Sequence, residues 1–531
     1  MEHALTPVVP AIAIALALIV LAVTALGRRL PVPTPILQVI AGLLVGLAPG
    51  AGAFRLEPSV VFFVFLPPVL WSAAFFTSFR DFRANLRPIG LLAIGLVIAT
   101  TGVVALVAHV LLPGIPWAAA IALGAIVSPP DAVAAEAILS RLPVPRRIVV
   151  ILQGESLVND ASALVLYRTA VVAAVSGYFS LGETIVRFFV DAAVGIVIGL
   201  AVAWLLIRLA RVTRDSLAEA ILSLLGPYMA WVVAESFHVS AVLACVAGGL
   251  YVRQHFSSAV SPASRMQTRA VWDLVIFILN ALIFLLLGVQ FGGLMLAVPA
   301  EMMGLVVRAG LIISALAIAI RLAWVPLGTW LPRWLSADVR RREKAPTAKG
   351  VFLVGWTSMR GIVSLASAMA LPLVLDNGQP FPYRAQIVLI TMFVIVITLV
   401  AQGLTLAPLI RRLNFPGDVS EHEEEVHARR EAIRHALEKL DDPSDEPWAR
   451  PEDVTQLREE YQRQARSHVA LASGNAEHVH ARRRLRAKVL RAERRSLIRL
   501  RNEGAISDEV LHHLERELDV EALRIGEGEA R

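Results

Sequence analysis

Charged residues are scarce in this 531-residue sequence: only 18% of the residues are Asp, Glu, Lys or Arg, and 56% are hydrophobic. Soluble domains hold about 25% charged and about 45–50% apolar residues. The mean hydropathy is +0.65, and the apolar residues form long runs up to Arg411. Most runs approach the roughly 20 apolar residues that a membrane-spanning helix needs. The composition therefore excludes an ordinary soluble fold and predicts an all-α integral membrane protein.

Several features that indicate other classes of protein are also missing. The single cysteine, Cys245, excludes an internal disulfide. No phosphate-binding glycine loop and no His-Glu-x-x-His motif occurs, so ATP-driven transport and zinc proteolysis lack support. We expect no cofactor and no nucleic-acid partner. The N-terminal residues lack the basic stretch of a signal peptide, which predicts a retained first helix.

Hydropathy predicts about thirteen spanning helices. Their ranges are 8–27, 34–48, 58–77, 88–112, 116–140, 147–174, 182–208, 216–236, 239–253, 270–295, 302–330, 348–374 and 385–411. If the N-terminus lies outside, the inner loops hold 20 Lys and Arg residues, against Arg55, Arg187 and Arg384 in the outer loops. Basic residues favour cytoplasmic loops. This asymmetry predicts strict alternation of the helices across the plasma (inner) membrane.

The sequence changes character after residue 412. Residues 1–412 carry a formal net charge of +12, and residues 413–531 carry −5. Apolar residues recur at helical spacing among many charges in the second part, which predicts a helical cytoplasmic tail. Its basic run over 482–495 fits either a solvated helical face or a grip on anionic lipid, and we favour the solvated face.

The fifth predicted span contains Ser128-Pro129-Pro130-Asp131 at mid-membrane. Two prolines remove two backbone donors, so an unbroken helix is not expected. Unwound backbone at this depth survives only inside protein or beside a water-filled cavity, and it supplies ion ligands in many transporters. The simpler alternative is a proline kink in which Asp131 caps the second half-helix. We favour the functional interpretation because an acid is present.

The sixth span contains Glu155, Ser156, Asn159 and Asp160. At helical spacing Ser156 and Asp160 share one face, and Glu155 and Asn159 share the neighbouring one. Two carboxylates this close in a low dielectric do not both remain charged and unpaired. Packing between helices explains Ser and Asn but not two acids.

Arg360 stands in the middle of the twelfth span, where an Arg needs an acidic partner. We predict that Arg360 pairs with Glu155 and that Asp160 stays unpaired and titratable. For Arg168, Arg308 and Arg321, within or near the ends of other spans, snorkelling to the membrane interface is the default expectation.

These segments resemble the monovalent cation:proton antiporters, specifically the Na⁺/H⁺ exchanger branch with the bacterial NhaP-type proteins. The resemblance rests on four motifs in the expected order: Phe65-Leu66-Pro67-Pro68, Gly154-Glu155-Ser156-Leu157-Val158-Asn159-Asp160, Met359-Arg360-Gly361 with Val363-Ser364-Leu365-Ala366, and the tail segment 501–510.

The resemblance implies roles for the polar residues. Asp160 would bind the cation and protons alternately, beside Asn159, whose amide is associated with electroneutral exchange. Asp131 and Ser156 would join the ion site, and Glu155 and Arg360 would form a structural ion pair. Pro130 stands where many members have Thr, so Ser128 or a backbone carbonyl would supply the ligand from this segment.

The resemblance also implies an architecture. The fold would be an inverted repeat with two discontinuous, crossing helices, the fifth and twelfth spans. Spans over 88–174 and 302–411 would form the moving core, and spans over 8–77 and 216–295 a scaffold and homodimer interface.

The function expected from residues and resemblance together is antiport of Na⁺ or Li⁺ against H⁺, serving pH and sodium homeostasis. A K⁺/H⁺ antiporter of the same fold is the alternative. A channel would conduct far faster, and a membrane enzyme using Ser156 and Asp160 lacks a nearby base.

Overall fold

The computed structural model describes most of the chain. The described residues are 8–27, 29–30, 32–48, 57–139, 142–177, 181–213, 215–297, 299–342, 345–415, 419–441, 450–472, 477–503 and 505–525. They divide into two compact units, Met1–Gly417 and Asp418–Arg531. The predicted boundary lay a few residues earlier, after residue 412.

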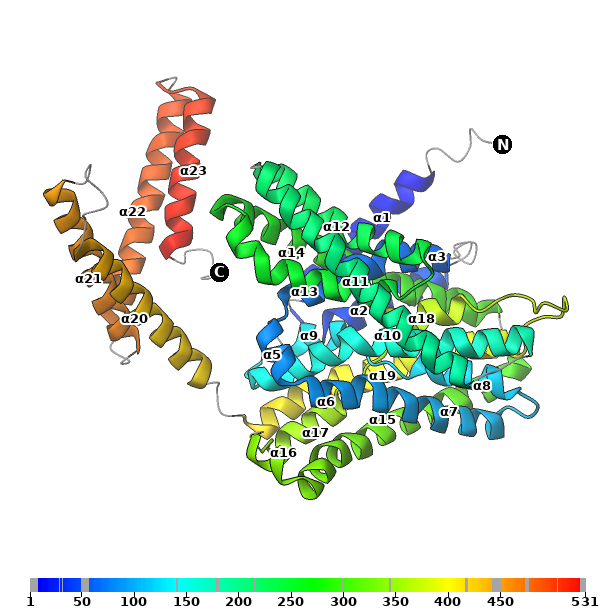
Figure 1. Cartoon of the computed structure of the whole chain (residues 1–531). Coiled ribbons are helices and arrows are strands. Elements are labelled where there is room, and N and C mark those ends of the chain that lie inside the picture. Colours follow the sequence, from blue (N-terminus) through cyan, green and yellow to red (C-terminus); the bar gives the residue numbers. More distant parts are fainter. Residues whose placement is uncertain are drawn as a thin grey trace. The chain divides into compact units, whose positions relative to one another are not determined.

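The regular elements in the described part of the first unit are all helices, apart from one isolated β-bridge between Val374 and Pro380. Figure 1 shows its helices, which are α1 (Val8–Gly27), α2 (Thr34–Gly46), α3 (Pro58–Val60), η3 (Val61–Phe65), α4 (Leu66–Phe76), α5 (Phe79–Ala84), α6 (Leu86–Gly90), η4 (Leu91–Leu96), α7 (Val97–Leu111), α8 (Trp117–Val127), α9 (Ala132–Leu139), α10 (Arg146–Ser176), α11 (Leu181–Thr213), α12 (Ser216–Ser236), α13 (Ala241–Ala259), α14 (Pro262–Ala297), α15 (Ala300–Leu335), α16 (Ala337–Arg342), α17 (Ala348–Trp356), α18 (Ile362–Met369) and α19 (Arg384–Leu413). Every predicted span coincides with one or more of these helices, so the all-α prediction is confirmed.

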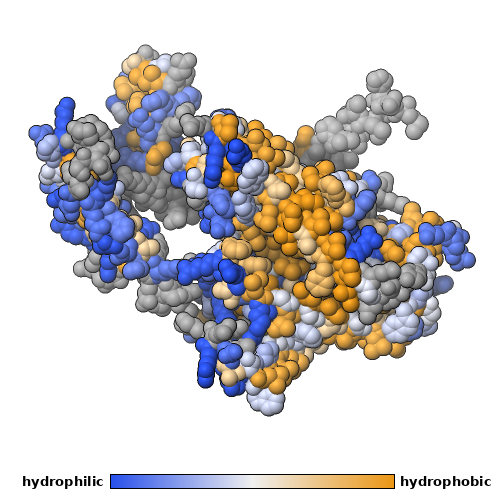
Figure 2. Space-filling model, in the orientation of Figure 1, coloured by the Kyte–Doolittle hydropathy of each residue, from blue (hydrophilic) through white to orange (hydrophobic). Residues whose placement is uncertain are grey.

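Seven helical segments in the described part of the chain are long and apolar enough to cross a membrane. They present large apolar side chains outward: Val110 is 73% exposed, Phe189 65% and Val197 63%. Figure 2 shows hydrophobic residues gathered over the helices of this unit. Contiguous apolar surface of this kind would be unfavourable in water and suits lipid. The first unit is therefore a multi-pass membrane domain.

Two spans are interrupted where the sequence predicted it. Residues 128–131 separate α8 from α9, and residues 357–361 separate α17 from α18. The first interruption follows from Pro129 and Pro130, which cannot donate the backbone hydrogen bonds of a continuous helix. The two interruptions lie against each other, because the backbone N–H of Asp131 donates to the carbonyl of Met359 at 2.7 Å.

The Leu-Pro-Pro segment also changes the local helix. α4 begins at Leu66, directly after the π-helical turn η3, and Pro67 and Pro68 stand in its first turn. Pro68 has no N–H for the carbonyl four residues earlier, which belongs to Val64. The hydroxyl of Tyr228 on α12 donates to that carbonyl at 3.2 Å. A neighbouring helix thus satisfies the group that the proline leaves free, as expected at membrane depth.

Glycines let α2 and α14 touch backbone to backbone. A Cβ on Gly42 would stand 2.0 Å from the carbonyl oxygen of Leu285, and a Cβ on Gly288 would stand 2.1 Å from that of Val39. One turn further along the two helices, a Cβ on Gly46 would stand 2.3 Å from the carbonyl oxygen of Val289, and one on Gly292 would stand 2.9 Å from the backbone of Gly46. Small residues four apart are the usual basis of tight helix packing in membranes.

The second unit contains four amphipathic helices: α20 (Val419–Asp441), α21 (Pro451–Ala472), α22 (Glu477–Asn502) and α23 (Asp508–Ile525). Within the basic run, Arg486 pairs with Glu521 and Arg494 with Asp519 of α23. These pairs support the solvated, acid-interspersed face over a purely lipid-binding one.

We expect Gly288→Ala to destabilise the membrane unit, because the new methyl group collides with backbone that has no room to move. Overpacking of this kind costs about 1–3 kcal/mol, so the thermal unfolding temperature in detergent should fall. Gly304→Ala on α15 is the matched control, since nothing lies within 4 Å of the added Cβ. Equal stability of the two variants would contradict the close α2–α14 contact.

Candidate functional site

The site lies where the two interrupted spans cross, beside the middle of α10. Each interruption leaves the end of one half-helix and the start of another at membrane depth. Helix N-termini carry partial positive charge and C-termini partial negative charge, and both expose unpaired backbone groups. The polar side chains of the site compensate these ends.

Asp131 occupies the side with the N-termini. Its Oδ1 accepts from the backbone N–H of Val133 in α9 at 2.8 Å, and the backbone N–H of Ile362 at the start of α18 also bonds to this carboxylate. The carboxylate lies directly over Gly361, where a Cβ would stand 1.6 Å from Oδ2. Asp131 is therefore an N-cap, as the simpler alternative proposed, and it also faces the neighbouring half-helix. Any side chain at position 361 would overlap the carboxylate, so only glycine allows Asp131 to lie here.

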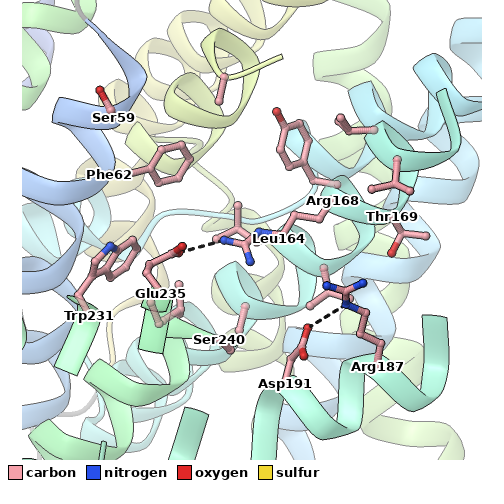
Figure 3. A pocket seen from close by; sticks show the side chains of 18 of the residues that line it. Ser59, Phe62, Leu164, Arg168, Thr169, Arg187, Asp191, Trp231, Glu235 and Ser240 are labelled. Atoms are coloured by element: carbon pink, nitrogen blue, oxygen red, sulfur yellow. Dashed lines mark hydrogen bonds and ion pairs between the residues drawn. The ribbon is translucent and has the colours of Figure 1, made fainter. Parts of the chain in front are cut away.

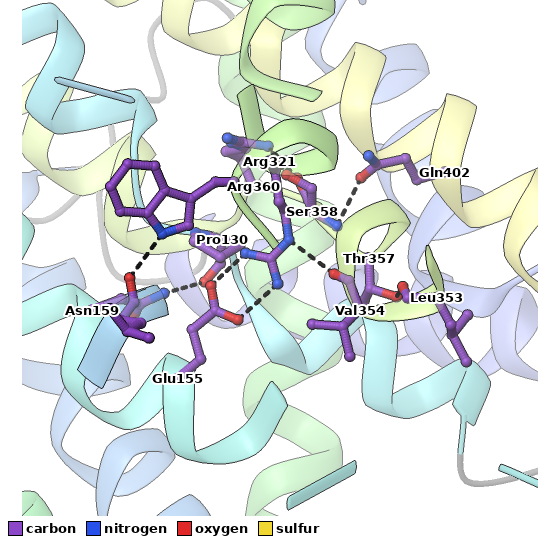
Figure 4. Close-up of polar contacts among 12 residues, drawn as sticks. Pro130, Glu155, Asn159, Arg321, Leu353, Val354, Thr357, Ser358, Arg360 and Gln402 are labelled. Carbon is purple, nitrogen blue, oxygen red and sulfur yellow. Dashed lines mark hydrogen bonds and ion pairs between the residues drawn. The ribbon is translucent and has the colours of Figure 1, made fainter. Parts of the chain in front are cut away.

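Arg360 occupies the side with the C-termini. Its Nε donates to the carbonyl of Val127, the last residue of α8, at 3.0 Å. Its Nη1 donates to the carbonyl and the hydroxyl oxygen of Ser358, just past the end of α17. Figure 4 shows Arg360 beside Ser358 in this network. Cationic donors at helix C-termini satisfy free carbonyls and oppose the dipole.

The predicted ion pair between Glu155 and Arg360 is wrong. Glu155 pairs with Arg321 of α15, whose Nη2 donates to Oε2 at 2.7 Å and whose Nη1 donates to Oε1. The physical reason is that the half-helix carbonyls occupy Arg360, while Arg321 reaches Glu155 with both arms of its guanidinium (Figure 4). The bidentate geometry favours this pair.

The expectation that Arg321 snorkels is wrong as well. Its side chain is 1% exposed, and its Nε donates to the carbonyl of Val354 in α17 at 3.0 Å. Residue 321 lies nine positions from the predicted end of its span at residue 330, or about 13 Å along a helix. An arginine side chain is too short for that distance, and this depth was the signal that sequence reasoning missed.

Asp160 and Ser156 line a cavity of about 60 Å³ together with Asp131. This volume exceeds the roughly 10–15 Å³ that a single water needs. Asp160 is 7% exposed, and among the described residues its carboxylate has neither an ion pair nor a hydrogen bond. The charged neighbour that acts on it is Asp131, which has the same sign. Of these two carboxylates, that of Asp131 is held by backbone donors and that of Asp160 is uncompensated.

Two other predicted ligands lie behind the cavity. The amide nitrogen of Asn159 donates to the carbonyl of Pro130 at 2.8 Å (Figure 4), and its Oδ1 is buried with no partner among the described residues. The hydroxyl of Ser128 donates to the carbonyl of Ala125 at 3.0 Å. Neither side chain lines the cavity, so both support the unwound segment in this structure.

The cavity also has walls that sequence reasoning missed. Glu136 of α9 lines it and accepts a hydrogen bond from Gln153 of α10 at 2.7 Å. Its position five residues after Asp131, in a segment predicted to lie within the membrane, could have marked Glu136 as a site residue. Ser364 of α18 lines it too, although its motif was noted only for the resemblance.

A second, wider cavity of about 830 Å³ lies near the end of α10 that the topology prediction places outside. It reaches Ala161, the neighbour of Asp160, and is bordered by α11, α12 and α13. Figure 3 shows Arg168 of α10 paired with Glu235 of α12 at 3.0 Å, beside the Arg187–Asp191 pair of α11. Arg168 therefore forms an ion pair within the protein, so its charge does not depend on reaching the membrane interface. Two ion pairs thus line this cavity.

We predict that Glu155 couples energetically to Arg321 and much less to Arg360. Arg321→Met leaves a buried carboxylate unpaired, which costs about 3–5 kcal/mol. Adding Glu155→Gln should recover much of the lost thermal stability, whereas adding it to Arg360→Met should not. A double-mutant cycle on unfolding temperatures measures this, and stronger coupling in the 155–360 cycle would refute the pairing.

Comparisons with known proteins identify the family of this chain. Residues 14–412 match the family model described as sodium/hydrogen exchanger, transmembrane. The chain is 35% identical over 521 residues to an uncharacterised Na⁺/H⁺ exchanger of Mycobacterium bovis, covering 96% of this chain and 95% of that protein. It is 31% identical to a sodium, potassium, lithium and rubidium/H⁺ antiporter of Bacillus subtilis, covering 92% of this chain and 74% of that one.

A solved structure shares the fold. The sodium proton antiporter MjNhaP1 of Methanocaldococcus jannaschii superimposes with a TM-score of 0.58 at 18% identity, over 78% of this chain and 99% of that one. With a family model that covers most of the chain and relatives matched over nearly its whole length, this protein belongs to the sodium/hydrogen exchanger family of cation/proton antiporters and is a transporter, not an enzyme.

Proposed function

We propose that this antiporter exchanges Na⁺ or Li⁺ for H⁺, one for one, at the carboxylate of Asp160. The observation that carries the proposal is the uncompensated burial of this group beside Asp131. A buried charge without a partner is strongly unfavourable. Either a proton or a bound cation relieves it, and the two exclude each other at one carboxylate.

The charges around the crossing support a one-for-one exchange. Glu155 is paired with Arg321, and the carboxylate of Asp131 accepts from backbone N–H groups. Glu136 also lines the cavity, but it is exposed on α9. Asp160 is left as the buried carboxylate with one uncompensated negative charge. One proton or one monovalent cation neutralises it, so both loaded forms have the same charge. If only loaded forms move between the two faces, exchange is obligatory and electroneutral.

The remaining groups would complete cation coordination. Ser156 lines the cavity one turn before Asp160, and Asp131 faces it from the unwound segment. Asn159 would hold the carbonyl of Pro130 in place, and Glu155 with Arg321 would fix α10 against α15. Ser128 would support α8 from within, and Arg360 would hold the two C-termini together.

The cation could instead be K⁺. The Bacillus subtilis relative is named for sodium, potassium, lithium and rubidium, and a site of carboxylate and hydroxyl oxygens suits any alkali cation. We favour Na⁺ or Li⁺ because the matching family model and the Mycobacterium bovis relative are both described as sodium/hydrogen exchangers.

The cellular setting is part of the same proposal. The protein would sit in the plasma membrane as a homodimer, with its N-terminus outside and its tail in the cytoplasm. There it would serve pH and sodium homeostasis. The basic bias of the predicted inner loops supports the orientation.

We expect Asp160→Asn to abolish exchange, because an amide neither binds a proton at ordinary pH nor balances a cation. Purified protein is placed in sealed proteoliposomes with an imposed pH gradient, and Na⁺, Li⁺ or K⁺ is added in turn. The wild type should collapse the gradient with the preferred cation and the variant should not. Asp273→Asn on α14, where the side chain is exposed, is the matched control. Undiminished cation-dependent flux in Asp160→Asn would sink the proposal.

We further expect Na⁺ concentration jumps to evoke no steady current from wild-type proteoliposomes on a solid-supported membrane, since each cycle moves no net charge. The same vesicles with gramicidin added provide the positive control. A current that follows the Na⁺ gradient in the wild type would contradict one-for-one exchange.

A further inference from the structure

One wall of the small cavity carries a hydroxyl that nothing in the mechanism above uses. Ser364 of α18 is 2% exposed, and its Oγ has no hydrogen-bond partner among the described residues. It lines the same cavity as Asp131 and Asp160. A buried hydroxyl left unsatisfied costs about 1–3 kcal/mol, so an unused one at this depth needs an explanation.

The position of Ser364 explains why it stays free. Serines within helices usually donate back to the carbonyl three or four residues earlier, as Ser162 and Ser314 do here. Ser364 stands in the first turn of α18, and the residue four positions earlier is Arg360, in the unwound segment. The carbonyl three positions earlier, that of Gly361, accepts from the backbone N–H of Leu365, and the Oγ of Ser364 bonds to neither carbonyl.

The same position sets Ser364 opposite the two acids. It follows Gly361 by three residues and so shares a face of α18 with it, and the carboxylate of Asp131 lies over Gly361. Asp160 and Ser156 border the cavity from α10. The cavity is thus walled by carboxylates and hydroxyls from three separate elements, α10, α18 and the unwound segment before α9.

We propose that the Oγ of Ser364 is a ligand of the transported alkali cation and helps to set which cation is preferred. A hydroxyl oxygen has two lone pairs to offer, and hard cations take oxygen ligands from several side chains at once. The hydroxyl of Ser128 is engaged with Ala125, so Ser364 joins Ser156 as the second hydroxyl at the cavity. This inference rests on the proposed exchange at Asp160.

The test is Ser364→Ala in proteoliposomes, with apparent KM and maximal rate measured separately for Na⁺, Li⁺ and K⁺. We expect the apparent KM for the preferred cation to rise about tenfold, the effect of losing one oxygen ligand worth about 1.4 kcal/mol. The maximal rate should stay within about twofold of the wild type, the ratio of KM values among the three cations should change, and Ser364→Thr should retain wild-type KM.

Ser367→Ala is the matched control. Ser367 lies on the same helix and is also 2% exposed, but it does not line the cavity. Unfolding temperatures with and without each cation show whether the variants fold and supply a binding readout independent of transport. Ser364→Ala should lose most of the cation-induced stabilisation.

Each outcome decides a different question. Wild-type KM values and selectivity in folded Ser364→Ala would overturn the ligand role while leaving exchange at Asp160 intact. An equal rise of KM in Ser367→Ala would show that the effect comes from altered packing of α18, and it would overturn the ligand role of Ser364. A wild type that moves no protons with any cation would overturn the proposed function and the ligand role together.

Discussion

Broken helices inside a membrane leave backbone groups that lipid cannot satisfy, and this constraint organises the whole site. Pro129 and Pro130 break one span, and an unwound stretch before Gly361 breaks the other. The two broken spans cross at their breaks, so that the two half-helix N-termini lie together and the two C-termini lie together. Asp131 lies at the N-termini, and Arg360 lies at the C-termini. Side chains of α19 complete the support, because Gln402 accepts from the amide of Ser358 and Thr398 accepts from that of Arg360.

The groups that satisfy the helix ends leave the negative charge of Asp160 without a partner among the described residues. Arg360 is engaged with carbonyls, and Arg321 neutralises Glu155, so neither is at hand for Asp160. The antiport account needs one carboxylate with this property. A fixed counter-ion would hold Asp160 permanently charged, whereas its absence makes a proton or a cation necessary. In this account two acids on one helix have different tasks: Glu155 fixes α10 against α15, and Asp160, five residues later, binds the proton or the cation.

Hydropathy predicted the spans, the prolines predicted the break in the fifth span, and helical spacing predicted the shared face of Ser156 and Asp160, because each of these patterns acts locally. The break in the twelfth span contains no proline and was expected only from the family resemblance. The partner of Glu155 was not predictable in the same way, because the choice between Arg360 and Arg321 depends on which one the half-helix carbonyls occupy. Ser128 and Asn159 were predicted to belong to the cation site, but their hydrogen bonds with Ala125 and Pro130 turn them away from the cavity. The direction in which a side chain points after a helix unwinds is a property of packing.

The most direct test of the account counts protons. Purified protein in detergent is titrated with Na⁺ or Li⁺ by calorimetry in two buffers of different ionisation enthalpy, which gives the number of protons released for each cation bound. The account predicts about one proton per cation near the midpoint of the protein's own titration, and none from Asp160→Asn. Cation binding without proton release in the wild type, or the same release from Asp160→Asn, would contradict competition at a single uncompensated carboxylate.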